Sequence, residues 1–277
     1  METVLSVISC LLIASVLISM VHRSYWVFRV LEYPRLQKLA IMIPIIVVWL
    51  YYDPFDKPFY TFCFTGLCLA LVYLVYKISP YTFLNKREMK QITAAGSDCI
   101  SIFAANVLQE NREYGKMLQQ IEATSPDVVF LLETDKGWEQ AMKPLERSHP
   151  YVLKEPRDNT YGLLFYSRLK ILNGKVMHLV KSGIPSIDAV VALQSGRKVQ
   201  LYGLHPEPPV PGENLYSTAK DKELMKVALK ARDCNLPCIV FGDLNDVAWS
   251  YTTTLFRKTS ELLDPRRGRG FYSTFSA

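Results

Sequence analysis

The segment Pro237-Cys-Ile-Val-Phe-Gly-Asp-Leu-Asn-Asp246 is the part of the sequence most informative about the fold. Its first five residues are a short apolar run typical of a buried strand, and a glycine, two acids and an amide follow them. Other apolar runs along the chain also end directly before a polar residue, and these residues are Asn106, Glu133 and His205. Sites are usually built on loops at strand ends. We therefore expect these three side chains and the Asp243/Asn245 pair to converge on one rim of a sheet.

The sequence around this stretch predicts a mixed α/β domain over residues 98–277. Strands are expected at 100–105, 127–133, 161–166, 171–179, 187–193, 199–204 and 237–241, and helices at 112–123, 135–146 and 218–232. Ser217 is the expected N-cap of the last helix. Lys220 and Asp221 are expected on the solvated face of that helix, and the arginines of 266–269 in solvent, with phosphate binding as the alternative.

The residue types at the predicted rim suit phosphate chemistry with a metal. Carboxylates and amides provide the oxygen ligands that Mg²⁺ prefers. A histidine suits contact with a phosphate or a leaving group. The absence of a glycine-rich phosphate loop argues against a nucleotide-dependent kinase. Cys234 and Cys238 are not followed by a second Cys/His pair, which argues against zinc.

The first 78 residues predict a membrane module. Residues 4–21 and 58–76 contain no charge and approach the roughly 20 residues that cross a bilayer as a helix. Residues 39–52 form a shorter apolar stretch, for which a re-entrant segment is the alternative to a third span. The first stretch lacks the basic flank of a cleaved signal peptide, so we expect it to be retained. Residues 79–97 form a polar linker.

The charge distribution predicts the orientation of the membrane module and argues against nucleic acid as a partner. Residues 22–38 and residues 77–90 each hold four Lys/Arg, whereas the short turn 53–57 holds only Lys57. This bias places the following domain in the cytoplasm of a multi-pass membrane protein. Residues 98–277 hold 23 Lys/Arg and 21 Asp/Glu, so a broad nucleic-acid-binding surface is not expected.

Taken together, the motifs resemble those of the endonuclease/exonuclease/phosphatase superfamily, whose fold is similar to deoxyribonuclease I. The resemblance is carried by Asn106, Leu132-Glu133-Thr134, Asn159-Thr-Tyr-Gly162, Gly203-Leu-His-Pro206 and Gly242-Asp-Leu-Asn245, in that order. It implies a two-sheet β-sandwich flanked by helices, with Mg²⁺ or Mn²⁺ as cofactor. The membrane prefix looks like that of a bacterial membrane-anchored branch.

The resemblance also implies roles for individual side chains. Glu133 would ligate the metal with Asn106 beside it, His205 would contact the scissile phosphate, Asp243 would orient the attacking water, and Asn245 would hydrogen-bond a phosphate oxygen. Asn159 and Tyr161 would bind substrate. The implied function is a membrane-anchored, metal-dependent phosphoesterase. Its partners would be the lipid bilayer and a phosphorylated substrate, with a lipid phosphate or pyrophosphate as the leading class and nucleic acid less favoured.

One departure from the superfamily pattern leaves alternatives open. The superfamily carries an Asp-His pair near its C-terminus, whereas the last histidine here is His205 and no acid follows Asp264. We therefore expect a sandwich that is incomplete at the C-terminus, in a fragment or in a protein with impaired catalysis. The alternative functions are a membrane-tethered nuclease and a catalytically impaired protein that binds a phosphate ligand.

Overall fold

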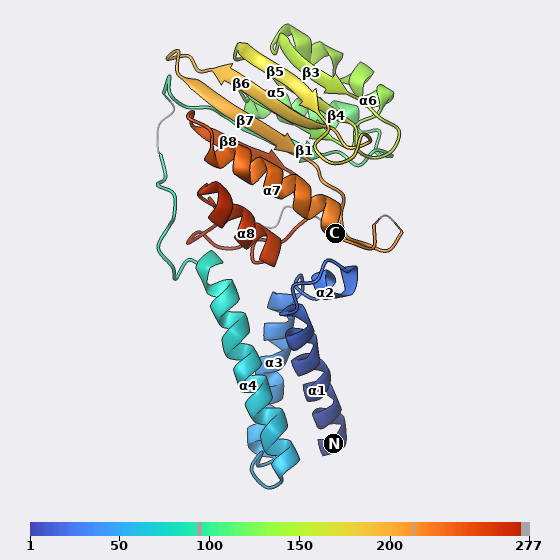
Figure 1. The fold of residues 1–277 in the computed structure, drawn as a ribbon, viewed down its shortest axis with the longest axis vertical. Coiled ribbons are helices and arrows are strands. Elements are labelled where there is room, and N and C mark those ends of the chain that lie inside the picture. Colours follow the sequence, from blue (N-terminus) through green and yellow to red (C-terminus); the bar gives the residue numbers. More distant parts are fainter. Residues whose placement is uncertain (93–95, 213, 273–277) are drawn as a thin grey trace.

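Two four-stranded sheets form the centre of the α/β domain in the computed structural model, which describes residues 1–92, 96–212 and 214–272 (Figure 1). The first sheet has the order β1-β2-β4-β3 and the second the order β5-β6-β7-β8. The strands are β1 (Ile102–Asn106), β2 (Val128–Leu132), β3 (Tyr151–Glu155), β4 (Leu163–Ser167), β5 (Ile171–Met177), β6 (Ser186–Ala192), β7 (Lys198–Leu204) and β8 (Cys238–Gly242).

Each sheet combines one parallel pair of strands with antiparallel neighbours. β1 pairs with β2 in parallel, with Asn106 opposite Leu132, and β7 pairs with β8 in parallel, with Leu204 opposite Gly242. All other pairs are antiparallel. Parallel pairing brings the carboxyl ends of β1 and β2 to one sheet edge, and those of β7 and β8 to another. Because β1 also lies against β8, these four ends meet.

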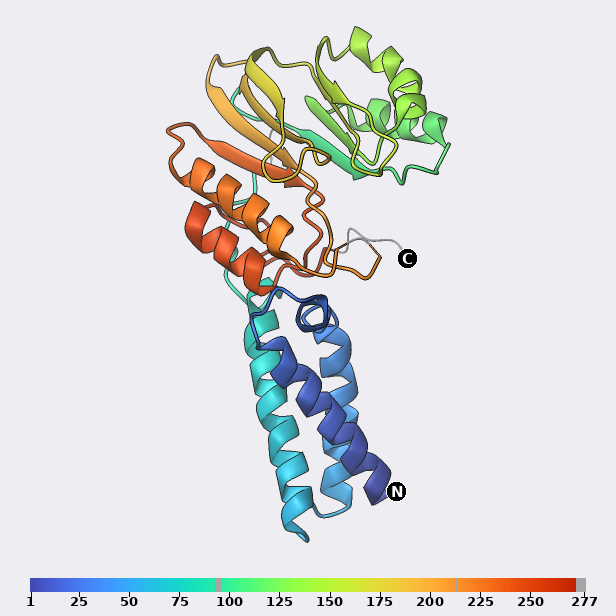
Figure 2. The ribbon, with the colours of Figure 1, turned by 45° about the vertical axis from the view of Figure 1, so that its right-hand side comes forward.

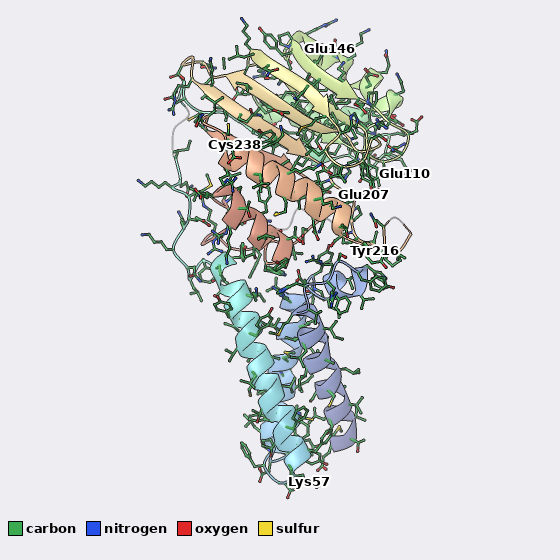
Figure 3. All side chains as sticks on the ribbon, in the orientation of Figure 1. Lys57, Glu110, Glu146, Glu207, Tyr216 and Cys238 are labelled. Atoms are coloured by element: carbon green, nitrogen blue, oxygen red, sulfur yellow. The ribbon has the colours of Figure 1, made fainter. Side chains whose placement is uncertain are left out.

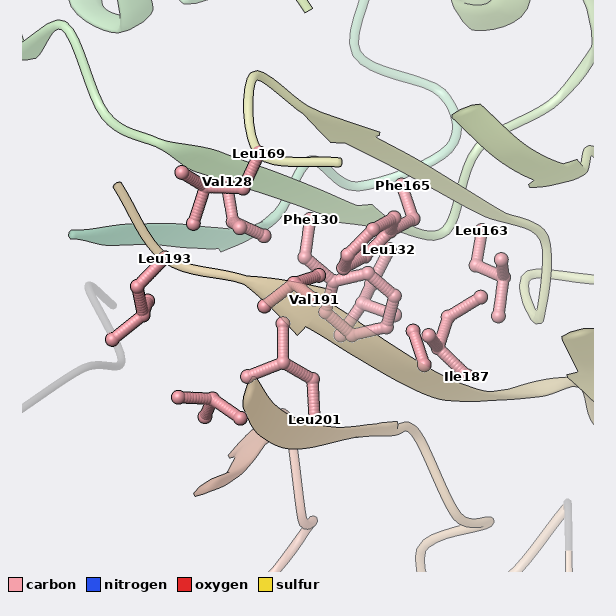
Figure 4. Packing of buried hydrophobic residues seen from close by; sticks show 12 residues of the cluster. Val128, Phe130, Leu132, Leu163, Phe165, Leu169, Ile187, Val191, Leu193 and Leu201 are labelled. Atoms are coloured by element: carbon pink, nitrogen blue, oxygen red, sulfur yellow. The ribbon is translucent and has the colours of Figure 1, made fainter. Parts of the chain in front are cut away.

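The main core lies between the two sheets (Figure 4). Phe130 is fully buried there and meets the edges of Phe165 and Phe241, with ring centroids 6.4 and 5.3 Å away. Gly203 leaves room for this ring, because a Cβ at Gly203 would lie 2.9 Å from Phe130 Cζ. Burial of one such aromatic side chain contributes about 2–3 kcal/mol. This packing joins the sheets into a sandwich.

Helices cover both outer faces of the sandwich (Figures 1 and 2). The first sheet is covered by α5 (Tyr114–Thr124), α6 (Lys136–Ala141) and the 3₁₀ helix η2 (Lys143–Arg147), and the second by α7 (Thr218–Arg232) and α8 (Tyr251–Ser260). The observed α/β fold of two mixed sheets flanked by helices agrees with the prediction. The predicted helix 135–146 is divided instead into α6 and η2, because Pro144 lacks the N–H that would continue α6.

The N-terminal segment forms a bundle of three long helices. Its elements are α1 (Glu2–Ser19), α2 (Trp26–Val30), α3 (Arg35–Tyr51), α4 (Pro58–Ile78) and the 3₁₀ helix η1 (Ser79–Tyr81). Trp49, Leu67 and Leu74 are buried at its centre. In the described part of the chain, α1 and the segment Pro58–Tyr81 are the two helices long and apolar enough to cross a membrane. The bundle extends below the α/β domain, with α7 and α8 between it and the sheets (Figure 2).

Candidate active site

Four predicted site residues meet where β1, β2, β7 and β8 end. Asn106 is the last residue of β1, and Glu133, His205 and Asp243 directly follow β2, β7 and β8. The Asn106 side chain joins the two carboxylates, because its Nδ2 donates to Glu133 Oε1 at 2.6 Å and lies 3.3 Å from Asp243 Oδ2. Side chains 137 positions apart in the sequence therefore form one cluster.

The orientation of the Asn106 amide is fixed by the backbone. Its Oδ1 accepts a hydrogen bond from Leu108 N at 3.1 Å, so its NH₂ group faces Glu133 and Asp243. In the described part of the chain no lysine or arginine pairs with either carboxylate. Two carboxylates around a neutral amide attract a cation, and oxygen donors suit a hard one such as Mg²⁺. The chemistry of these residues therefore suits a divalent metal, although among the described residues no three His, Cys, Asp or Glu side chains are arranged so that they could hold an ion by themselves.

His205 forms the buried side of the cluster. It is 3% exposed, and its Nε2 lies 3.9 Å from Glu133 Oε1. Its ring lies against that of Tyr161, with centroids 5.3 Å apart. The packing of Tyr161 restricts the orientation of the imidazole, which leaves its Nε2 on the side of Glu133.

The backbone of the site adopts an uncommon conformation. Glu133 and Asn245 have positive φ values of 60° and 49°, in the left-handed region that most side chains avoid. Such residues cost about 1–3 kcal/mol each and persist where the surrounding structure holds them. Gly242 has a φ of 124°, and a Cβ there would lie 2.1 Å from the carbonyl oxygen of Leu204. The motif glycine is therefore required by the close approach of β7 and β8.

Asn245 connects the two motifs that follow β7 and β8. Its backbone N–H donates to Asp243 Oδ1 at 3.0 Å, and its Nδ2 donates to the carbonyl of Pro206 at 2.9 Å. One oxygen of the Asp243 carboxylate is thereby held, while the other faces Asn106. Asn245 thus fixes the position of Asp243 relative to the segment that carries His205.

The predicted substrate-binding residues line a cavity of about 540 Å³ beside this cluster. Asn159 Oδ1 accepts from Tyr161 N at 3.2 Å, and Asn159 Nδ2 donates to the Gly183 carbonyl at 3.3 Å. The other wall comes from residues 180–184 and Glu207, which the sequence did not indicate. Glu207 pairs with Lys181 and lies on the flank of the domain that also carries Tyr216 (Figure 3). The ring of Tyr161 joins this cavity to His205.

Sequence reasoning was wrong about Lys220 and Asp221. Lys220 is 2% exposed, and its Nζ donates to Asp246 Oδ2 at 2.8 Å and to the Asn245 carbonyl at 3.2 Å. Asp221 accepts from Arg29 Nη2 at 3.0 Å. The one sequence feature that could have indicated the burial of Lys220 is Asp246, the second acid of the motif, because a buried acid needs a charged partner.

The arginines of 266–269 are also not free in solvent. Arg266 forms an ion pair with Asp264 at 2.7 Å, and Arg267 forms one with Glu88 at 2.7 Å. Arg269 donates to the Met89 carbonyl at 2.9 Å. These contacts fix the C-terminal segment to the region after α4. The three arginines bind protein groups, so the expectation that they are solvated was wrong.

The family model for the Endonuclease/Exonuclease/phosphatase family matches residues 103–277. The chain therefore belongs to this family, whose members generally depend on divalent metals. No curated protein matches the chain significantly.

Several solved structures are similar to the chain. TDP2 of D. rerio, complexed with a single-strand DNA product, is 23% identical, with a TM-score of 0.46 over 54% of this chain and 62% of that chain. The human Nocturnin catalytic domain with bound sulfate is 20% identical, with a TM-score of 0.48 over 58% and 70%. Sphingomyelinase C from Streptomyces griseocarneus is 15% identical, with a TM-score of 0.48 over 60% and 70%. The chain thus spans less than two thirds of the TDP2 chain.

Proposed function

We propose that the chain is a membrane-anchored, metal-dependent phosphoesterase that hydrolyses a phosphate or pyrophosphate ester of a membrane-associated substrate. The observation that carries the proposal is the contact of one amide, Asn106, with the carboxylates of Glu133 and Asp243. Phosphoryl transfer depends mainly on positioning and on neutralisation of spread negative charge. A cluster of two carboxylates and a histidine on rigid strand ends provides the positioning, and a divalent metal held there would provide the neutralising charge.

Each side chain has a proposed part in the reaction. Glu133 would hold the Mg²⁺ or Mn²⁺ ion with Asn106 beside it, and the ion would supply positive charge to the phosphoryl group. Asp243 orients the attacking water and accepts a proton from it. The carboxylate is in a fixed position for this role, because one of its oxygens accepts a hydrogen bond from Asn245 N. His205 contacts the scissile phosphate, and Asn245 offers its side-chain amide to a phosphate oxygen.

We propose that the cavity beside the cluster holds the part of the substrate that is attached to the scissile phosphate. Asn159 and Tyr161 line it, and Tyr161 also contacts His205. The pairing of Lys181 with Glu207 on its wall leaves the wall close to neutral. A cavity of about 540 Å³ is large enough for a small polar group or one end of a longer chain.

A membrane anchor supports a membrane-associated substrate. We propose that α1, α3 and α4 cross the bilayer, because apolar side chains such as Leu11, Val47 and Leu69 are 60–67% exposed on their outer faces. Anchoring raises the effective concentration of the domain near substrates in the same membrane. The small net charge of residues 98–277 counts against a nuclease, since binding to a nucleic-acid backbone relies on many Lys/Arg contacts.

The test is metal-dependent phosphate release by the detergent-solubilised chain from a lipid pyrophosphate and from a soluble phosphodiester. Glu133→Gln and Asp243→Asn are expected to lower kcat by about 10²–10⁴-fold. Glu133→Gln is also expected to weaken Mn²⁺ binding in calorimetry. Glu122→Gln, at an exposed position on α5, is the matched control and should change neither.

The same experiment separates the alternatives. Metal binding without turnover by the unaltered chain would favour a protein that only binds a phosphate ligand. Faster cleavage of single-stranded DNA than of any phosphate ester would favour the tethered nuclease. Turnover that survives Asp243→Asn would contradict the role proposed for Asp243.

A further inference from the structure

The β8–α8 loop, residues 243–250, leaves the candidate active site in the direction of the helical bundle. Three of its backbone carbonyls accept hydrogen bonds from side chains of residues 1–92: Tyr33 Oη to Asn245 O at 3.4 Å, Tyr81 Oη to Ala248 O at 2.6 Å and Arg35 Nη1 to Trp249 O at 2.7 Å. These donors lie 167–214 positions from their acceptors in the sequence. The conformation of the loop therefore depends on a segment outside the α/β domain.

The contact is reciprocal. Trp249 Nε1 donates to the Glu32 carbonyl at 3.0 Å, and Tyr251 N donates to Glu32 Oε2 at 3.0 Å. Trp249 also packs against the apolar core of the helical bundle. Residues 22–35, which we call the connector, thus both donate to and accept from the segment 245–251.

The loop that follows β7 rests on the same connector. Trp26 N donates to the Leu215 carbonyl at 2.9 Å, and Ser217 N donates to the Ser24 carbonyl at 2.7 Å. In both views α2, which belongs to the connector, lies near the N-terminal end of α7 (Figures 1 and 2). The loops that begin at His205 and at Asp243 are therefore held by one element.

The charges at this contact favour a positioning role over a stabilising one. Arg35 and Glu32 are 1% and 2% exposed, and their charged groups lie 3.9 Å apart. The cost of removing two charges from water largely cancels the attraction between them, so such a pair adds little stability while it fixes geometry. Burial raises the pKa of Tyr33 well above its ordinary value, so its hydroxyl stays protonated and able to donate.

We propose that the connector is part of the active-site framework and that its hydrogen bonds with the β8–α8 loop, donated by Tyr33 and by Trp249, position that loop. Asn245 has a left-handed backbone and holds Asp243 through its N–H, and such a conformation persists only where its surroundings determine it. Tyr33 and Lys220 supply that constraint by donating to the same Asn245 carbonyl. The effect on turnover rests on the proposed function, whereas the effect on the loop does not.

The test uses the full chain in detergent with Tyr33→Phe and Trp249→Phe, singly and together. Each substitution keeps an aromatic side chain and removes one donor. The matched controls are Tyr166→Phe and Trp138→Phe, whose buried polar atoms find no hydrogen-bond partner among the described residues. Hydrogen exchange is measured for the amides of residues 243–250, with the amides of β4 as the internal reference.

In the double variant, exchange in the β8–α8 loop should accelerate about tenfold or more while β4 is unchanged. With a soluble phosphodiester and Mn²⁺, kcat should fall about tenfold with KM within twofold, because misplacement by about 1 Å can cost up to 10²-fold. The two control variants should leave both readouts unchanged. Tyr33→Phe alone should give a smaller effect of the same kind.

Unchanged exchange in the loop of a folded double variant would overturn the proposal. Acceleration spread equally over β4 would also overturn it, because that result indicates only a structural contribution. An unaltered chain that turns over no substrate would refute the proposed function, and the exchange measurement would still decide the positioning role. Faster loop exchange with unchanged kcat would refute the link between the connector and catalysis.

Discussion

At the scale of single residues, Gly242 determines how closely the strands that carry His205 and Asp243 approach each other. A Cβ there would lie 2.1 Å from the Leu204 carbonyl oxygen, at a φ of 124° that side chains rarely adopt. Gly115, on α5, faces open space instead. The two glycines therefore offer a matched pair for testing whether the geometry of the β7–β8 rim is required.

Gly242→Ala is expected to destabilise the domain by about 2–3 kcal/mol or more, because β8 must move away from β7. For a chain of this size the thermal midpoint should fall by roughly 5–10 °C. Gly115→Ala should leave it unchanged or raise it slightly, since alanine favours a helix over glycine by about 1 kcal/mol. Thermal unfolding of both variants in detergent measures this, and equal midpoints would contradict the assigned role of Gly242.

Residue types revealed the cluster but not the residues that support it. Asn106, Glu133, His205 and Asp243 each follow an apolar run, and parallel pairing brings them together, so their convergence was predictable. The burial of Lys220 was not, because its acid partner is 26 positions away in the sequence. A lysine in a charged helix is usually solvated, and only the tertiary contact with the β8–α8 loop makes this one an exception.

At the scale of elements, the strands with continuous apolar runs were predictable and the others were not. β2, β4 and β7 are buried along nearly their whole length, and their sequences contain the expected runs. β3 was missed because Tyr151–Glu155 is only partly buried and contains charged residues. α8 was missed because threonines occupy its first turn, although Ser250 caps it by accepting from Thr253 N. Edge and surface elements depend on neighbours that a sequence does not display.

α7 carries a buried acid that makes stability depend on pH. Glu223 is 2% exposed and accepts from Ser186 Oγ on β6 at 2.7 Å, and burial raises its pKa to about 7. The folded chain therefore binds this proton more tightly than the unfolded chain, whose value is near 4.5. The resulting stabilisation is present below pH 4.5 and is lost as pH rises through about 7.

Glu223→Gln should remove this dependence while it keeps an acceptor for Ser186. Relative to the unaltered chain, the variant should gain up to about 1.4 kcal/mol per pH unit between roughly pH 5 and 7. Thermal midpoints measured across that interval give the difference, with Glu122→Gln on the exposed side of α5 as control. A difference that stays constant with pH would show that Glu223 is not protonated in the folded chain.

At the scale of the molecule, the helical bundle exposes many apolar side chains on its outer faces, and exposure of such surface to water is unfavourable. Leu69 lies near the middle of α4 and is 67% exposed, and Leu84 lies beyond η1 and is 82% exposed. If α4 crosses a bilayer, Leu69 contacts lipid and Leu84 does not. Both side chains are largely exposed, so an arginine at either position should be tolerated in water and only a membrane should distinguish them.

Leu69→Arg should therefore reduce membrane integration, because an arginine at the centre of a spanning helix costs about 3 kcal/mol. Leu84→Arg should have no such effect. The measurement is the fraction of each variant that resists alkaline extraction from membranes, with the unaltered chain as reference. Equal fractions for the two variants would contradict the proposal that α4 crosses the bilayer.

The positions of the basic residues predict the side of the membrane on which the domain lies. Glu2 and Lys57 approach within 3.5 Å at the end of the bundle away from the domain (Figure 3), and the connector and the end of α4 lie at the other end. All eight Lys/Arg of residues 22–38 and 77–90 are therefore at the domain end, against Lys57 at the other.

Arg29, Arg35 and Lys38 are buried in the folded chain, but the charge bias acts during insertion, before these contacts form. We therefore expect the domain to lie in the cytoplasm. Alkaline phosphatase fused after Ala277 in a bacterial host should be inactive there and active when inserted after Asp56. A fluorescent protein fused after Ala277 should give the opposite result. Active alkaline phosphatase after Ala277 would place the domain outside, and would mean that export of a large domain overrides the charge of the short segments.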